Sequence, residues 1–141
     1  MAFETGIERH PYVQDWLMPF GYEIVDLGNG EKEFRLEHPI LNFIRIDYQA
    51  RLHFGEIEVV IESPFTLVTA NTITHQLDPN LRSGLGPFLA LYPNTLTKAM
   101  MSRRGELRLA FQDGTYLTVP PDEKYEAWSV GGFWCIPGGF H

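Results

Sequence analysis

The chain has 141 residues, of which 44% are hydrophobic and 21% are charged, and its formal net charge is −7. This length and composition predict one globular domain over residues 1–141 and exclude a disordered chain. The acidic balance excludes a surface that follows a nucleic-acid backbone, and no apolar run approaches the roughly 20 residues that cross a bilayer.

The first predicted elements are an arm and a hairpin. Residues 1–21 hold two prolines among several aromatic residues, so they are too broken for a long helix and too apolar for a loose tail. We expect this arm to pack against the body of the protein. The runs 22–27 and 33–36 flank Gly28-Asn29-Gly30, and Asn-Gly between two such runs predicts a β-hairpin.

An internal pseudo-repeat, residues 44–64 and 95–121, follows. In each copy apolar and polar residues alternate up to a glycine turn, and a second alternating run comes after it. Alternation with a period of two is typical of a strand with one apolar face, so each copy predicts an antiparallel hairpin. Residues 95–102 predict a strand that leads into the second hairpin. The only basic doublet, Arg103-Arg104, comes next, and we expect it in a solvated turn.

The two hairpins need different turns. In the first, a two-residue turn pairs Leu52 with Val59 and keeps the paired apolar residues on one face. In the second, only a three-residue loop pairs Leu109 with Leu117. That loop predicts a positive φ at Gly114.

Residues 78–92, between the two copies, predict one short helical segment. Asp78 can cap it, and apolar residues recur at helical spacing until Pro93. Two glycines inside the segment weaken a continuous helix, which leaves two short turns as an alternative.

The end of the chain predicts a further hairpin around Gly131-Gly132. Pairing across this turn sets Val130 opposite Phe133 and Trp128 opposite Cys135, and the Pro-Gly-Gly that follows is expected to end the sheet. Together the elements predict a mainly β (α+β) fold. Its antiparallel hairpins form two related units of a sandwich or barrel-like single domain, with one short helical segment.

No set of residues has the spacing of a catalytic or metal site. Cys135 is a candidate nucleophile, but no cation or base lies beside it and its neighbours are apolar, as expected for a buried thiol. Glu58, Glu62 and Glu126 offer paired carboxylates, although strand alternation places the first two on a solvated face. The five histidines lack metal-ligand spacing, so we expect no metal and no cofactor.

Candidate binding residues gather near the C-terminus and are Tyr125, Glu126, Trp128 and Trp134. Alternation sends the two tryptophans to opposite faces of their hairpin, so one of them is covered by another part of the chain or by a partner. Packing within the chain is the favoured alternative. A partner contact stays open, because tryptophan and tyrosine dominate binding hot spots.

The second half of the chain carries three motifs, which are Leu-Arg-Leu-Ala-Phe-Gln-Asp-Gly at 107–114, Tyr-Glu-Ala-Trp at 125–128 and Pro-Gly-Gly at 137–139. Together they resemble a bacterial family described only as a domain of unknown function, and the resemblance covers about residues 44–139. That family has no assigned activity, so the resemblance implies no functional residue.

These observations favour a non-enzymatic, cytoplasmic protein-binding module, for example an immunity protein that neutralises a basic toxin. We expect no nucleic-acid and no membrane partner. Two alternatives stay open. One is a small-molecule binding protein or hydrolase with a pocket near Cys135 and Glu126, and the other is a homo-oligomeric structural protein that binds itself.

Overall fold

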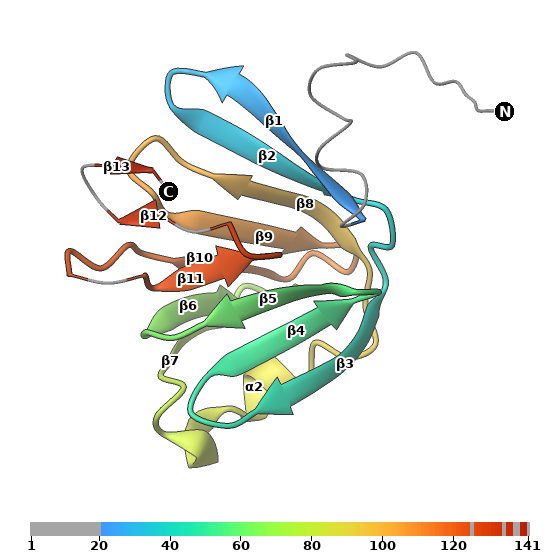
Figure 1. Ribbon diagram of the computed structural model, residues 1–141. Helices are drawn as coiled ribbons and strands as arrows, with labels where there is room; N and C mark the ends of the chain where they lie inside the picture. The colour runs from blue at the N-terminus through green and yellow to red at the C-terminus, as the bar shows by residue number, and fades with distance from the viewer. Residues whose placement is uncertain (1–20, 125, 134, 137–138, 141) are drawn as a thin grey trace, which may run out of the picture.

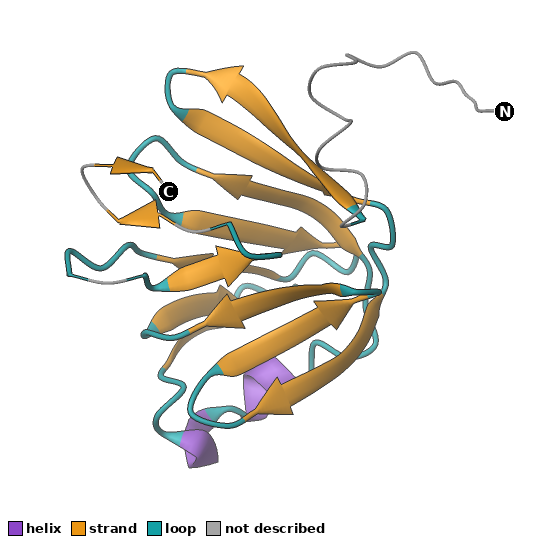
Figure 2. Cartoon of the chain, viewed as in Figure 1, coloured by secondary structure: helices purple, strands orange, loops and turns teal. Residues whose placement is uncertain are grey.

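The computed structural model describes residues 21–124, 126–133, 135–136 and 139–140, the last four by their backbone. Strands dominate this part of the chain, as Figures 1 and 2 show, and the prediction of a mainly β fold is confirmed. The arm expected over residues 1–21 lies outside the described residues, apart from Gly21.

Two antiparallel sheets form most of the fold. The large sheet has seven strands, in the spatial order β1 (Tyr22–Gly28), β2 (Glu31–Leu36), β8 (Leu96–Met101), β9 (Leu107–Phe111), β10 (Tyr116–Val119), β6 (Phe65–Val68) and β7 (Thr74–Leu77). The small sheet has four strands, in the order β11 (Trp128–Val130), β5 (Ile57–Ile61), β4 (Ala50–Phe54) and β3 (Leu41–Ile46). A further pair consists of β12 (Cys135–Ile136) and β13 (Gly139–Phe140).

The core lies between the large sheet and the small sheet, whose apolar side chains form one buried cluster. Phe54 of β4 stacks on Phe111 of β9 with ring centroids 6.5 Å apart, and Phe34 of β2 meets Trp128 of β11 edge-on at 6.0 Å. Within the described residues neither sheet closes on itself. The fold is therefore a sandwich and not a barrel.

Both central hairpins form in the predicted register. Leu52 pairs with Val59 between β4 and β5, and Leu109 pairs with Leu117 between β9 and β10. Gly114 has a φ of +97°, which confirms the three-residue loop. The first hairpin belongs to the small sheet and the second to the large sheet. The predicted N-terminal hairpin also forms, as β1 and β2.

The segment over residues 78–92 contains two short turns, η2 (Arg82–Gly84) and α2 (Gly86–Leu89), which is the alternative that its glycines suggested. Asp78 does not cap either turn. Its carboxylate accepts a hydrogen bond from the N–H of Asn80 at 2.9 Å and so makes a turn of its own. Among the described residues, no helix has the length and apolar character needed to cross a membrane.

The C-terminal pairing differs in part from the expectation. Val130 bridges to Phe133 as predicted, but Trp128 pairs with β5 and Cys135 pairs with β13. The three residues of β11 pair with β5 and so extend the small sheet, a pairing that the sequence around the Gly131-Gly132 turn could not predict. The Pro-Gly-Gly motif does not end the chain's pairing, because its last glycine begins β13.

Candidate functional site

A hollow lies on the face of the large sheet that is turned away from the core. Ala110 of β9 lies between Lys98 of β8 and Tyr116 of β10, which are its register partners. Leu109 and Leu117, the neighbours of Ala110 and Tyr116 along the chain, are buried in the core, so the row containing Ala110 points outward. The short side chain of Ala110 between two long ones leaves a hollow of about 410 Å³, which we call the Ala110 hollow.

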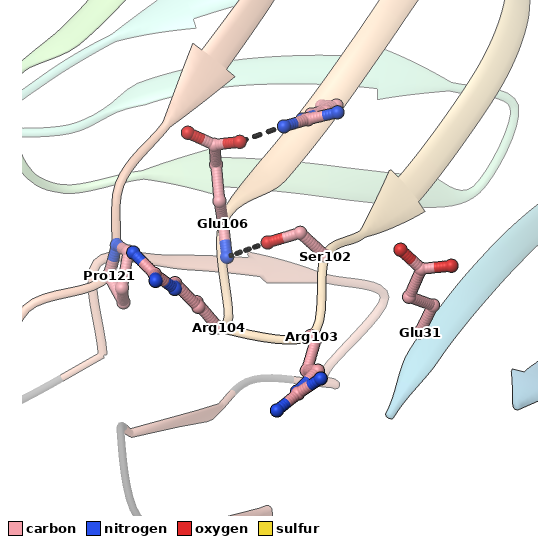
Figure 3. A pocket seen from close by; sticks show the side chains of 7 residues that line it. Glu31, Ser102, Arg103, Arg104, Glu106 and Pro121 are labelled. Carbon is pink, nitrogen blue, oxygen red and sulfur yellow. Dashed lines mark hydrogen bonds and ion pairs between the residues drawn. The ribbon is translucent and has the colours of Figure 1, made fainter. Parts of the chain in front are cut away.

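A second hollow of about 870 Å³ lies over the turn between β8 and β9 (Figure 3), and we call it the basic hollow. Glu106 and Arg108 line both hollows, so the two hollows adjoin each other. Among the described residues, those that line the basic hollow are Glu31, Ser102, Arg103, Arg104, Glu106, Arg108 and Pro121.

The turn that carries Arg103 and Arg104 is held by hydrogen bonds at its base. The N–H of Gly105 donates to the carbonyl of Ser102 at 2.9 Å, and the N–H of Glu106 donates to Oγ of Ser102 at 3.1 Å. Gly105 has a φ of +95°, a conformation that side chains disfavour. These contacts fix the backbone of the turn and leave both arginines exposed, as expected for this doublet.

Trp128 ties the same turn to the core. Its ring is 1% exposed, and its Nε1 donates a hydrogen bond to the carbonyl of Gly105 at 2.9 Å. The Trp128 ring is therefore packed within the chain, which is the alternative that the sequence favoured for one of the two tryptophans. It positions the turn that carries Arg103 and Arg104.

The cations around the two hollows differ in their partners. Arg108 pairs with Glu106 at 2.7 Å. Lys98, Arg103 and Arg104 form no ion pair with any part of the chain that the structure describes. A chain of net charge −7 therefore gathers unpaired positive charge on this face. Such an arrangement can bind carboxylate or phosphate groups.

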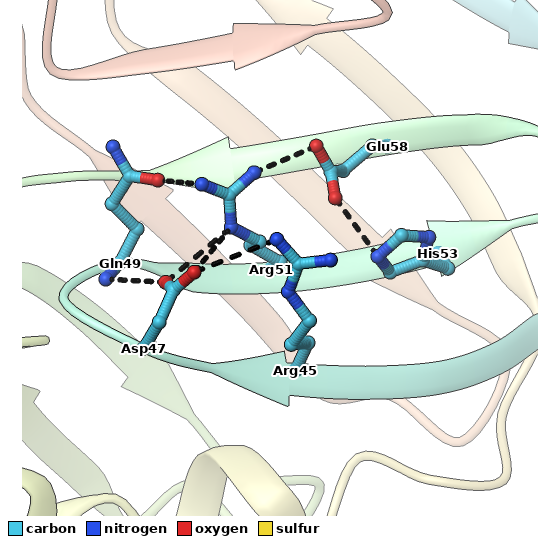
Figure 4. Close-up of polar contacts among 6 residues, drawn as sticks. All are labelled: Arg45, Asp47, Gln49, Arg51, His53 and Glu58. Carbon is cyan, nitrogen blue, oxygen red and sulfur yellow. Dashed lines mark hydrogen bonds and ion pairs between the residues drawn. The ribbon is translucent and has the colours of Figure 1, made fainter.

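The outer face of the small sheet carries a network of paired charges (Figure 4). Arg51 of β4 lies 2.8 Å from Glu58 of β5 and 3.3 Å from Asp47, and Arg45 of β3 lies 3.5 Å from Asp47. Nε2 of His53 lies 2.9 Å from Oε2 of Glu58, close enough for an ion pair, although the ring orientation completes no hydrogen bond. The charges in this network already face opposite charges, which indicates a cross-strand structural role.

Among the other predicted site residues, Glu126 is half-buried beside Glu62. Burial, followed by the charge of Glu62, raises the pKa of the Glu126 carboxyl. Tyr125 and Trp134 lie outside the described residues, and Cys135 is described by its backbone alone. Glu126 lines neither the basic hollow nor the Ala110 hollow.

Sequence reasoning missed Lys98, Ala110 and Tyr116, because strand pairing and not chain order brings them together. The one local signal for this face was the Arg103-Arg104 doublet. Within the described ranges, no three histidine, cysteine or acidic side chains gather where they could hold a metal ion.

Comparisons with known proteins place the chain in a family. The model of a family of unknown function (DUF6188) matches residues 33–139. Neither the curated proteins nor the solved structures show a match. The matched range includes the three motifs on which the family resemblance rests and extends it toward the N-terminus. The chain therefore belongs to the family of unknown function DUF6188.

Proposed function

We propose that the protein is a non-enzymatic protein-binding module that takes an acidic segment of a partner protein on the outer face of the large sheet. The observation that carries the proposal is the set of cations around two adjoining hollows, Lys98, Arg103 and Arg104, without an ion-pair partner in the described chain. A charged patch of this kind attracts and orients a partner of opposite charge.

The lining of the hollows favours a protein segment over a nucleic acid. Glu31 and Glu106 lie among the arginines and interrupt the positive charge, so the surface offers separate cationic positions for individual carboxylates and not the continuous positive track that a phosphate backbone follows. Met100 and Tyr116 add apolar surface, and Tyr116 is 46% exposed. Arginine, methionine and tyrosine are enriched in protein–protein interfaces.

Photo-cross-linking from this face tests the proposal. Tyr116 is replaced by p-benzoylphenylalanine in the full chain, and the cross-linked segment is sequenced after irradiation in the native cells. The same protein carries either Arg103→Glu with Arg104→Glu, or a control with the same change in charge, Arg82→Glu with Lys124→Glu. Both control residues are exposed and line neither hollow.

We expect cross-links to an acidic segment, lost in the Arg103/Arg104 variant and retained in the control. Three results would overturn the proposal. They are a cross-linked segment without acidic residues, an equal yield from both variants, and tighter binding of a labelled DNA duplex than of the captured segment. A cross-link to a second copy of the chain, confirmed by sedimentation of a dimer, would replace the proposal with the homo-oligomeric alternative.

Neutralisation of a basic toxin is a second candidate, which the contact between Glu62 and Glu126 favours. Two carboxylates held side by side gain stability when a cation binds between them. A partner arginine or lysine at this end of the small sheet would supply that cation. The test is toxin neutralisation by Glu62→Gln with Glu126→Gln, compared with the Arg103/Arg104 variant. Loss in the glutamine variant alone supports this candidate, and unchanged neutralisation refutes it.

A further inference from the structure

We infer that the acidic partner segment lies extended along β8, seats one apolar side chain in the Ala110 hollow, and carries two carboxylates about four residues apart, which contact Lys98 and the Arg103-Arg104 turn. This inference rests on the proposed function. It adds the conformation of the bound segment and the spacing of its side chains.

The position of the partner's apolar side chain follows from the surroundings of Ala110. Register places Lys98 on one side of it and Tyr116 on the other, while Met100 lies two residues from Lys98 on the same face of β8. A volume of about 410 Å³ falls in the range of ligand pockets, roughly 300–1,000 Å³. A leucine-sized side chain in this hollow would cover the methyl group of Ala110 and the thioether of Met100.

The spacing of the carboxylates follows from the positions of the cations. Lys98 lies within β8, which ends at Met101, and the turn that carries Arg103 and Arg104 begins at Ser102, four positions after Lys98. A strand rises about 3.3 Å per residue, so about 13 Å separates Lys98 from the start of the turn. A partner segment in strand conformation has the same rise, and only residues an even number apart point to the same face, so its two carboxylates must be about four residues apart.

The width of the site favours an extended segment over a helix. Two strand spacings separate β8 from β10, a span of about 10 Å between backbones. The long side chains of Lys98 and Tyr116 stand on either side of Ala110 and narrow this span. A helix with its side chains is about 10–12 Å wide and would not fit between them, whereas a strand would.

Two synthetic peptides of identical composition test the spacing. Ser-Glu-Thr-Leu-Thr-Glu-Thr-Ser has the inferred arrangement, and Ser-Leu-Thr-Glu-Thr-Glu-Thr-Ser is its permuted control. Each is titrated at low salt into the isotopically labelled full chain, and the affinity is read from the methyl resonance of Ala110. We expect the spaced peptide to bind about tenfold more tightly, since only it can seat the leucine and engage both charged positions.

Two variants test the seat of the apolar side chain. Ala110→Leu fills the hollow without a change in charge, and Val68→Leu adds bulk on the far side of Tyr116 as its control. For the spaced peptide we expect about a tenfold loss of affinity with Ala110→Leu, read from backbone amide shifts, and no loss with Val68→Leu.

The outcomes separate this inference from the proposed function. Equal affinities for the two peptides, or an unchanged affinity in Ala110→Leu, would refute the extended arrangement. If the extended arrangement is refuted in this way but Arg103→Glu with Arg104→Glu abolishes the binding of both peptides, the proposed function stands without the extended arrangement. If that double variant binds both peptides as well as the unmodified chain does, the proposed function fails as well.

Discussion

Replacement of Trp128 by phenylalanine should loosen the Arg103-Arg104 turn and lower the stability of the whole chain. The indole Nε1 donates to the carbonyl of Gly105, a residue that is itself buried, so water cannot replace the lost donor. A buried carbonyl left without a partner costs about 1–3 kcal/mol. The smaller ring adds a packing loss of about 1 kcal/mol. We expect the free energy of unfolding to fall by about 2–4 kcal/mol in total.

The control for this experiment is Phe34→Leu, which removes packing against the Trp128 ring without touching the hydrogen bond to Gly105. Urea unfolding measures the stability of both variants, and amide hydrogen exchange measures the opening of residues 102–106. Only Trp128→Phe should speed exchange in the turn beyond what its global stability explains. Equal exchange in the turn of both variants would show that the indole does not position it.

Two further predictions concern glycines and a carboxylate. Gly131→Ala should destabilise the fold more than Gly114→Ala, although both positions have a positive φ. A Cβ at 131 would lie 2.7 Å from the ring of the buried Tyr22, whereas a Cβ at 114 would lie 3.5 Å from its nearest neighbour, the Cβ of Ala70. Equal melting temperatures would refute this difference. Glu126→Gln should raise the free energy of unfolding at pH 7 by about 0.2–1 kcal/mol, because a raised carboxyl pKa disfavours the charged form in the folded state. The gain should fade as the pH falls from 7 toward about 4, because the folded chain takes up the proton first, and it should be absent below about 4, where the unfolded chain holds the proton too. A gain that persists in acid would contradict this cause.

The hairpins could be predicted because the residues that determine their register lie close together in the sequence. Leu52 and Val59 share a face only if the intervening turn has two residues, so alternation and turn chemistry determine the register together. The order of strands within each sheet carries no such signal. β2 lies beside β8, and β11 lies beside β5, across long stretches of intervening chain. Which edges meet depends on the packing of the whole sandwich.

The candidate site could be predicted only in part, for the same reason. Arg103-Arg104 is visible as a doublet, but its hollow requires β2 and the residues after β10 as walls. Ala110 looks like an ordinary small residue until pairing sets it between Lys98 and Tyr116. Trp128 is a candidate binding residue from its sequence, whereas in the structure its indole holds the Arg103-Arg104 turn through one hydrogen bond to Gly105.

The contrast between the two outer faces leads to a last prediction. Arg51 is 18% exposed and contacts Asp47 and Glu58, so Arg51→Gln leaves Glu58 without an arginine and Asp47 with Arg45 alone, and should cost about 1 kcal/mol of stability. Arg103→Gln with Arg104→Gln removes two exposed cations that have no partner in the described chain, and the free energy of unfolding should change by less than about 0.5 kcal/mol. Urea unfolding measures both. A large loss in the double variant would make the doublet structural, whereas a stable variant that no longer binds acidic segments would assign these arginines to recognition.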